Sequence, residues 1–297
     1  MLSFKKLTLE DIDRLRPYFA HSQSKICDNT VGGTFMWRDF FSVEYAEAHG
    51  ALIFKVVVKY HGGATAFTVP LGGDVAGGIE EVEFYCRHYK IPLKYCTVTQ
   101  CDMGPLKAAY PVFSLHLEAD WSDYLYRAED IVSLAGRKYS GQRNHINYFK
   151  KSYSEPRFEE ITAANIGEVK AFYDEFNLVT NKASEIFAEE RRKTIEVLEN
   201  YNAYGLLGGL IRAEGKVAAF AAGEIWQGVL FVHIEKANPE IRGAYQVINN
   251  EFAKHFVSPG VEFVNREEDV GDMGLRTSKL SYHPCELIDK YIVEVEL

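Results

Sequence analysis

The sequence predicts a mixed α/β protein built from two similar halves. Apolar runs separated by glycine-containing turns indicate antiparallel strands, and apolar residues at helical spacing indicate amphipathic helices. The same order of strands and helices recurs in the second half of the chain. Helices interleaved with strands in this way favour mixed sheets covered by helices, and argue against an all-β barrel or a helical bundle.

Composition restricts the class of protein further. The chain has 297 residues, of which 47% are hydrophobic, enough for the cores of about two domains. No apolar stretch approaches the roughly 18 residues that span a bilayer, and the N-terminus lacks a signal-peptide pattern, so we expect a cytoplasmic protein without an integral membrane segment. The five cysteines are odd in number and contain no CxxC motif. We therefore expect reduced thiols and no metal site.

The first half shows a helix, an antiparallel strand pair, a second helix and a further strand. Leu15 and Phe19 lie on one face of the first helix, and glycines mark the turn of the strand pair. These elements are expected at residues 11–19, 53–58, 64–69, 79–89 and 94–98, with the turn at 60–63.

The second half repeats this order with one more strand in the meander. An apolar stripe over residues 169–176 predicts one helix, and Ser184 is placed to cap a second helix that runs to about residue 198. The remaining elements are strands expected at 206–211, 217–222, 229–234 and 261–265, and a helix at 245–256.

A basic run at residues 137–151 lies between the halves. It has five Lys or Arg, one His and no acidic residue, in a chain of formal charge -9. We predict a helix over 123–134 that ends at Gly136, followed by a basic helix capped by Ser140. The predicted basic helix divides the chain into an N-terminal domain (1–135), an inter-domain helix (136–155) and a C-terminal domain (156–297). The run is a candidate anion-binding surface, although a solvated helix face would look the same.

Several sequence blocks resemble a known family. The blocks are Tyr-Leu-Tyr-Arg-Ala-Glu-Asp at 124–130, Gly-Arg-Lys-Tyr at 136–139, Arg-Asn-His-Ile-Asn at 143–147, Asn-Arg-Glu-Glu-Asp-Val-Gly at 265–271, and Leu-Arg-Thr-Ser-Lys-Leu-Ser-Tyr-His-Pro at 275–284. They look like a soluble family related to the C-terminal domain of phosphatidylglycerol lysyltransferases, over essentially the whole chain. The resemblance implies two tandem GNAT-like acyltransferase domains, similar to the Fem-type aminoacyltransferases.

One loop bears on the class of donor. Acyl-CoA enzymes of the GNAT fold carry an Arg/Gln-x-x-Gly-x-Gly/Ala loop, whose glycines let backbone N–H groups approach a pyrophosphate. In this chain Arg242 and Gly243 are followed by the bulky residues Tyr245 and Val247. The departure disfavours acyl-CoA, while Arg242 and the helix dipole still favour an anion.

The densest polar chemistry lies in residues 265–283, just after a predicted strand end, where open sheets place ligands. We expect Glu267 or Asp269 to orient or deprotonate an acceptor. Arg276 and Lys279 would hold an anionic part of the donor or acceptor. A buried salt-bridge network is the alternative interpretation. His233 alternates with Glu235 on one strand, so both could face a central cleft with His233 as a general base.

The resemblance and these residues together favour an aminoacyltransferase-like enzyme. The donor would be aminoacyl-tRNA, bound through its phosphates by the basic run, and the acceptor an amine or hydroxyl of a small molecule, peptide or lipid. An acyl-CoA-dependent N-acetyltransferase of a small molecule and a non-catalytic anion-binding module remain alternatives. Expected catalytic residues are Glu267, Asp269 and His233. Expected donor or substrate contacts are Arg137, Lys138, Arg143, Asn144, Arg242, Tyr245, Asn265, Arg276 and Lys279.

Overall fold

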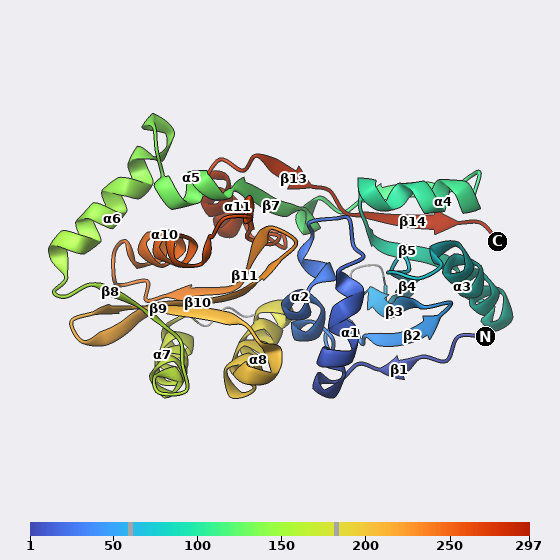
Figure 1. Ribbon diagram of the computed structural model, residues 1–297, viewed down its shortest axis with the longest axis horizontal. Coiled ribbons are helices and arrows are strands. Elements are labelled where there is room, and N and C mark those ends of the chain that lie inside the picture. Colours follow the sequence, from blue (N-terminus) through green and yellow to red (C-terminus); the bar gives the residue numbers. More distant parts are fainter. Residues whose placement is uncertain (59–61, 181–183) are drawn as a thin grey trace. The chain divides into compact units, whose positions relative to one another are not determined.

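The computed structural model describes residues 1–58, 62–180 and 184–297. They form two compact units. The first comprises Met1–Asp123, Glu268–Gly271 and Ile288–Leu297, and the second comprises Tyr124–Glu267 and Asp272–Leu287. Each unit has its own seven-stranded sheet with helices packed on it (Figure 1). The predicted mixed α/β class is confirmed.

The sheet of the first unit has the strand order β1-β2-β3-β4-β5-β14-β6. Its strands are β1 (Lys5–Lys6), β2 (Glu44–Ala48), β3 (Ala51–Val58), β4 (Ala64–Phe67), β5 (Leu93–Val98), β6 (Ser114–Leu117) and β14 (Tyr291–Val295). Neighbouring strands run antiparallel except β4 and β5, which are parallel.

Helices pack on both faces of this sheet. They are α1 (Ile12–Phe19), α2 (Val31–Met36), α3 (Val75–Tyr89) and α4 (Met103–Ala109). Consecutive residues of a strand point to opposite faces. Ile53 of β3 shares a core cluster with Ile79 and Val82 of α3, whereas Phe54 stacks on Phe19 of α1 with ring centroids 6.3 Å apart. Thus α1 and α3 cover opposite faces.

The sheet of the second unit has the order β13-β7-β12-β11-β10-β9-β8. Its strands are β7 (Asp123–Arg127), β8 (Arg157–Glu160), β9 (Leu207–Ala213), β10 (Lys216–Trp226), β11 (Val229–Ala237), β12 (Phe263–Asn265) and β13 (Glu286–Ile288). As in the first unit, a parallel pair, here β11 and β12, lies inside the sheet.

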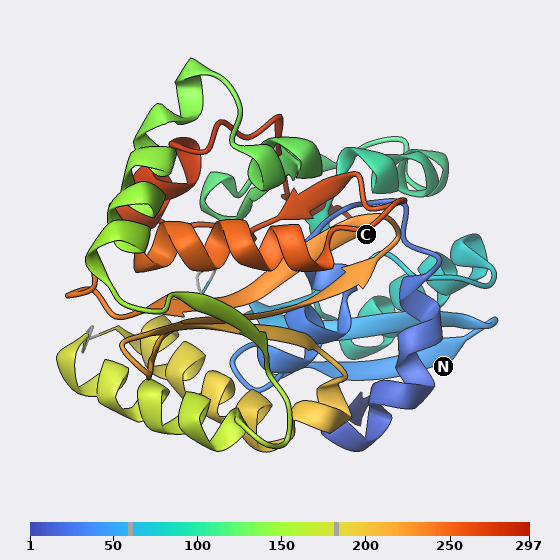
Figure 2. The ribbon, with the colours of Figure 1, turned by 60° about the vertical axis from the view of Figure 1, so that its left-hand side comes forward.

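The helices of the second unit are α5 (Ala128–Ser133), α6 (Ser140–Ser152), α7 (Ile166–Val179), α8 (Glu185–Glu199), α9 (Tyr201–Tyr204), α10 (Ala244–Phe256) and α11 (Met273–Leu280). Figures 1 and 2 show α10 on one face of the sheet and α7 and α8 on the other. Phe220 of β10 meets Phe172 and Tyr173 of α7 edge to face, with centroids 6.0 and 5.9 Å apart. Its neighbours Ala219 and Ala221 belong to the core cluster that includes α10.

The internal repeat is present, but the strand that lies beside the last strand of each repeat comes from a distant part of the chain. The elements β1 to β4, α3 and β5 recur as β8 to β11, α10 and β12. The last strand of the chain, β14, completes the first sheet beside β5, whereas β7, from mid-chain, completes the second sheet beside β12. The units therefore do not divide at residue 135. Helix α6 belongs to the second unit and is not a separate linker.

The segment around residue 130 differs from its prediction. Residues 123–134 do not form one helix, because Asp123–Arg127 pairs with β12 as strand β7 and only Ala128–Ser133 is helical. That helix ends at Leu134, which takes a left-handed φ of 46°, two residues before Gly136. Ser140 is the first residue of α6 and not its cap. Of the turn expected at 60–63, residues 60 and 61 lie outside the described residues.

Candidate active site

The parallel strands β11 and β12 of the second unit separate at their carboxyl ends. Their pairing stops at Phe231 and Asn265, and β11 continues to Ala237 beside β10. The chain after β12 stays with β7 instead: the Arg266 amide donates to the Tyr124 carbonyl at 3.1 Å. In open α/β sheets, ligands bind outside the carboxyl ends of such strands. This junction is therefore the candidate site.

Strand β11 has one extra residue opposite β10. Ala222 pairs with Ile234, and the next residue, Gly223, pairs with Val232, so His233 is the bulged residue. One inserted residue reverses the face to which the following side chains point. This bulge decides how the junction is built.

The bulge corrects the expectation that His233 and Glu235 face the same way. His233 lies on the side of Glu224 and of the Phe231 ring, which it stacks against. Glu235 lies on the opposite side, where it accepts a hydrogen bond from Asn249 of α10. Simple alternation along the strand could not reveal an inserted residue.

His233 is clamped between two carboxylates. Its Nδ1 lies 2.7 Å from Oε1 of Glu267 and its Nε2 lies 3.0 Å from Oε1 of Glu224, and its ring is 0% exposed. Burial alone lowers the pKa of His233, but the hydrogen bonds to Glu224 and Glu267 outweigh it and raise the pKa to about 10. The ring is thus an imidazolium at neutral pH, a state unsuited to the general-base role expected from the sequence.

Glu267 has an unusual backbone conformation at the opening of the strands. Its φ of 58° lies in the left-handed region, which is rare for residues other than glycine. Its amide donates to Oδ1 of Asn265 at 2.6 Å, and its side chain is 17% exposed. Of the predicted catalytic residues, Glu267 best retains access to solvent at the junction.

The opposite side of the junction holds a second charged group. Nη2 of Arg266 donates to Oε1 of Glu235 at 2.9 Å, and Nδ2 of Asn249 donates to Oε2 of the same carboxylate at 3.0 Å. The guanidinium lies 4.9 Å from the ring centroid of Tyr282 and 6.0 Å from that of Tyr126. Sequence reasoning missed Arg266 and Asn249 as site residues because only the bulge brings Glu235 to them.

Helix α11 carries the predicted cations Arg276 and Lys279, spaced three residues apart on one helix face. Nζ of Lys279 donates to the Arg266 carbonyl at 2.6 Å and lies 5.7 Å from the ring centroid of Tyr124. Lys279 is thus part of the junction. Asp269 is not, because it belongs to the first unit, where it is buried and its Oδ1 accepts the Gly271 amide at 2.9 Å.

Much of the basic run serves local structure. Nη1 of Arg143 donates to the carbonyls of Leu134 and Gly136, the latter at 2.7 Å, and so closes the end of α5. Lys138 pairs with Asp130 at 3.1 Å.

Other basic-run residues remain on the surface. Arg137, Asn144 and Lys151 are exposed, and Lys150 pairs with Glu251 at 3.1 Å. The positive surface is therefore smaller than the sequence suggested.

Helix α6 packs on the start of α10, where a pyrophosphate would approach. Gly243 has a φ of 91°, and a Cβ there would lie 2.5 Å from the His145 carbonyl oxygen. Arg242 lies over the Tyr148 ring at 4.5 Å, and Tyr245 is exposed. This packing adds to the argument against acyl-CoA at this loop.

The first unit contains a buried ionic cluster that sequence reasoning missed. Nζ of Lys290 lies 2.6 Å from Asp28 and 2.8 Å from Asp123, and the side chain is 1% exposed. Burial alone lowers the pKa of Lys290, but the carboxylates of Asp123 and Asp28 hold it well above its ordinary value.

Glu268 and Cys27 complete the cluster, at 3.5 and 3.7 Å from Nζ of Lys290. Ligand atoms of Cys27, Asp123 and Glu268 lie within 4.8 Å of one another, a spacing that suits a metal ion. The Lys290 ammonium supplies positive charge among these groups. Because the residues of this cluster are far apart in the sequence, they form no motif that sequence analysis could recognise.

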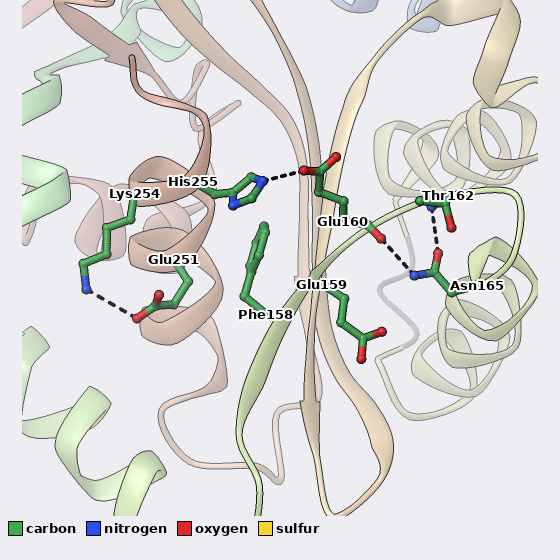
Figure 3. Close-up of a pocket in the computed structure, with 8 residues that line it drawn as sticks. All are labelled: Phe158, Glu159, Glu160, Thr162, Asn165, Glu251, Lys254 and His255. Carbon is green, nitrogen blue, oxygen red and sulfur yellow. Dashed lines mark hydrogen bonds and ion pairs between the residues drawn. The ribbon is translucent and has the colours of Figure 1, made fainter. Parts of the chain in front are cut away.

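An open pocket of about 710 Å³ lies at the other edge of the second sheet, by β8 and the end of α10 (Figure 3). It is lined by Phe158, Glu159, Glu160, Thr162, Asn165, Glu251, Lys254 and His255. Its polar groups pair with one another: His255 lies 2.7 Å from Glu160, and Lys254 lies 3.3 Å from Glu251. β8 is the edge strand of this sheet, and β9, β10 and β11 lie between it and β12. The pocket is therefore separate from the junction.

Known structures resemble the chain over its full length. A conserved protein of unknown function from Bacteroides thetaiotaomicron is 32% identical, with a TM-score of 0.91 and 100% of both chains covered. L-PGS from Bacillus licheniformis shares the fold at 14% identity, with a TM-score of 0.63 over 95% of this chain and 91% of that one. Within the described residues, no helix is both long enough and apolar enough to cross a membrane.

Sequence comparison assigns the family. An uncharacterized protein of Mycoplasmoides gallisepticum is 24% identical over 67% of this chain, and the match spans only 63% of that relative's length. The family model for the C-terminal part of phosphatidylglycerol lysyltransferase matches residues 19–294. The chain belongs to the phosphatidylglycerol lysyltransferase C-terminal domain family.

Proposed function

We propose that the chain is an aminoacyltransferase that moves an aminoacyl group from aminoacyl-tRNA to an amine or hydroxyl acceptor. The observation that carries this proposal is the family match over residues 19–294, which includes every residue of the charged junction. The family name makes a lysyl group and phosphatidylglycerol the first donor and acceptor to test. Such a reaction would take place in the cytoplasm, where aminoacyl-tRNA is made.

Glu267 is the residue we propose as proton acceptor. The acceptor's oxygen or nitrogen attacks the ester carbonyl, and its proton passes to the carboxylate of Glu267. The new bond forms at the carbonyl carbon, the bond to the ribose oxygen breaks, and the proton is delivered to that leaving oxygen. Glu267 suits this role because its side chain keeps solvent contact while His233 fixes one of its oxygens at 2.7 Å.

His233 acts as a positioning residue in this proposal. As an imidazolium between Glu224 and Glu267, it orients Glu267 and offsets part of the negative charge of the two carboxylates. His233 would thus orient the catalytic base, Glu267, and would not itself accept the proton.

Donor binding would use cations of the second unit. Lys279 of α11 belongs to the junction, Arg276 precedes it by three residues on the same helix, and Arg137 and Lys151 are exposed before and on α6. Phosphate contacts of this kind weaken steeply as salt increases. Arg143, Lys138 and Arg242 also make structural contacts, which restrict the atoms that they can offer to a donor.

The test is transfer of radiolabelled lysine from lysyl-tRNA to vesicles that contain phosphatidylglycerol. We expect transfer by the wild type and a loss of about 10²-fold or more in Glu267→Gln, since general-base catalysis contributes about 10²–10⁴-fold. Glu160→Gln is the matched control, because Glu160 also lies 2.7 Å from a histidine, His255, but at the distant pocket. Equal loss in both variants would contradict the assignment of Glu267.

The result also decides between classes of function. Stabilisation by acetyl-CoA, with no transfer from aminoacyl-tRNA, would replace the proposal by an acyl-CoA-dependent acetyltransferase. Absence of transfer to lipid, small-molecule amine and peptide acceptors, with anion binding retained, would leave a non-catalytic binding module.

A further inference from the structure

Two polar atoms beside the Glu235 carboxylate have no hydrogen-bond partner among the described residues. Nη1 of Arg266 and Oδ1 of Asn249 are buried and lack a hydrogen bond within the part of the chain that the structure describes. Both side chains are at least nine-tenths buried, at 9% and 4% exposure. Leaving such atoms unsatisfied is unfavourable, which makes them informative in a folded protein.

The hydrogen bonds determine which atoms are left over. Glu235 is a carboxylate and only accepts, so the Asn249 amide must turn its Nδ2 toward Glu235 and its Oδ1 away. Arg266 uses Nη2 on the other oxygen of the same carboxylate. One unpaired donor and one unpaired acceptor therefore flank a single negative charge.

This pattern complements an α-amino acyl group. Such a group presents an ammonium, which only donates, and a carbonyl oxygen, which only accepts, on adjacent carbons. The ammonium fits Oδ1 of Asn249 and the Glu235 carboxylate, and the carbonyl oxygen fits Nη1 of Arg266. A fatty acyl or acetyl group has no ammonium and would leave the acceptor side unpaired.

We propose that Arg266, Glu235 and Asn249 form the subsite that recognises the α-amino acyl end of the substrate. The inference rests on the proposed function and assigns the part of the donor that the junction recognises. Arg266 binds the ester carbonyl oxygen, while Glu235 and Asn249 hold the ammonium on the α10 side. Glu267 directly follows Arg266 at the end of β12 and would take the proton of the acceptor that attacks this carbonyl.

The probe is L-alaninamide, which keeps the ammonium and the carbonyl but needs no tRNA. Titration of L-alaninamide into the wild-type protein, monitored by calorimetry or NMR, should show saturable binding. N-acetyl-L-alaninamide keeps the carbonyl and loses the ammonium, and we expect it to bind at least tenfold more weakly. L-alanine, whose carboxylate replaces the amide, shows whether the site takes free amino acids as well as aminoacyl groups.

Asn249→Ala tests the residue directly. It should weaken L-alaninamide binding about tenfold or more, since a hydrogen bond to a charged group is lost. Asn177→Ala is the matched control: Asn177 is also a buried helical asparagine with one unpaired side-chain atom, but it lies on α7, on the other face of the sheet. That variant should bind as the wild type does.

Arg266→Lys keeps a positive charge beside Glu235 and removes the planar guanidinium. It should also weaken L-alaninamide binding, and it covers the case in which Asn249→Ala fails to fold. Thermal unfolding of each variant identifies the folded fraction to which affinities refer.

The outcomes separate this inference from the proposed function. Equal binding of L-alaninamide and its acetylated form, or no binding of either to the wild type, overturns the subsite even if transfer from lysyl-tRNA is observed. Ammonium-dependent binding that Asn249→Ala abolishes supports the subsite even if no transfer occurs, in which case the proposed function fails alone.

Discussion

The two units share a strand order but differ at the junction of their parallel strands. In the first unit, β4 meets β5 through Phe67 and Tyr95, both in an apolar core cluster. In the second unit, β11 is longer, has a bulge at His233, and brings charged side chains to the end of β12. The same topology therefore produces a packed core in one unit and a polar site in the other.

The buried charges of the two units differ as well. The ammonium of Lys290 is surrounded by Asp28, Asp123 and Glu268, a closed arrangement typical of a structural ion cluster. At the second junction, Arg266 and Asn249 each retain one polar atom that pairs with none of the residues the structure describes. Under the subsite proposal, the first unit uses buried charge for stability, and the second uses it for binding.

The largest effect is expected in the first unit. Lys290→Met removes the ammonium and leaves buried carboxylates without their cation, so we expect the free energy of unfolding to fall by about 3–5 kcal/mol. Lys94→Met is the control, because its pair with Glu294 is more exposed and is expected to contribute about 1 kcal/mol or less. Denaturant unfolding measures both. Similar small losses would mean that the cluster of the first unit is not structural.

The bulge at His233 is the next feature of the second unit that a substitution can test. A Cβ on Gly223 would lie 2.0 Å from the Phe231 carbonyl oxygen, so Gly223→Ala must shift β10 away from β11. We expect a loss of roughly 1–3 kcal/mol in stability, together with weaker L-alaninamide binding. Gly167→Ala on α7 is the control, since nothing lies within 4 Å of a Cβ there. If Gly223→Ala matches that control, the bulge does not require glycine.

The order of elements was predictable because it depends on local patterns. Strands such as β3 and β10 and helices such as α7 follow from apolar spacing, and Ser184 caps α8 as expected, accepting the Phe187 amide at 3.4 Å. The exchange of β7 and β14 was not predictable, since strand pairing across so many residues leaves no local signal.

The candidate site was predicted only in part. The polar block after β12 indicated Glu267, Asn265 and Lys279, which the structure places at the junction. A one-residue bulge moved Glu235 to the other face, and its partner Asn249 lies on a helix whose apolar pattern does not distinguish it. The residue types in the sequence indicate that such a site exists, while the register of the strands determines which side chains come into contact.

The pH dependence of stability tests whether the charged junction of the second unit holds His233 as an imidazolium. Its pKa is raised from 6.5 to about 10, so its stabilising contribution is complete below pH 6.5 and is lost as pH rises through 10. Between pH 7 and pH 9 we expect the wild type to lose about 2.5 kcal/mol more than His233→Gln, at 1.36 kcal/mol per pKa unit. Urea unfolding at each pH measures this difference. Parallel pH profiles for the two proteins would show that the ring is not held as an imidazolium.

The smallest effects are expected on the surface of the second unit. Arg137→Ala and Lys151→Ala should each weaken tRNA binding only a few-fold and reduce the slope of log affinity against log salt by about 1. Both residues are exposed on the segment from the start of the basic run to the end of α6, so neither change should alter folding. Lys6→Ala, on exposed β1 of the first unit, is the control for loss of a cation. An equal effect of Lys6→Ala would mean that tRNA is held by general attraction to cations, and that the second unit has no special share in binding it.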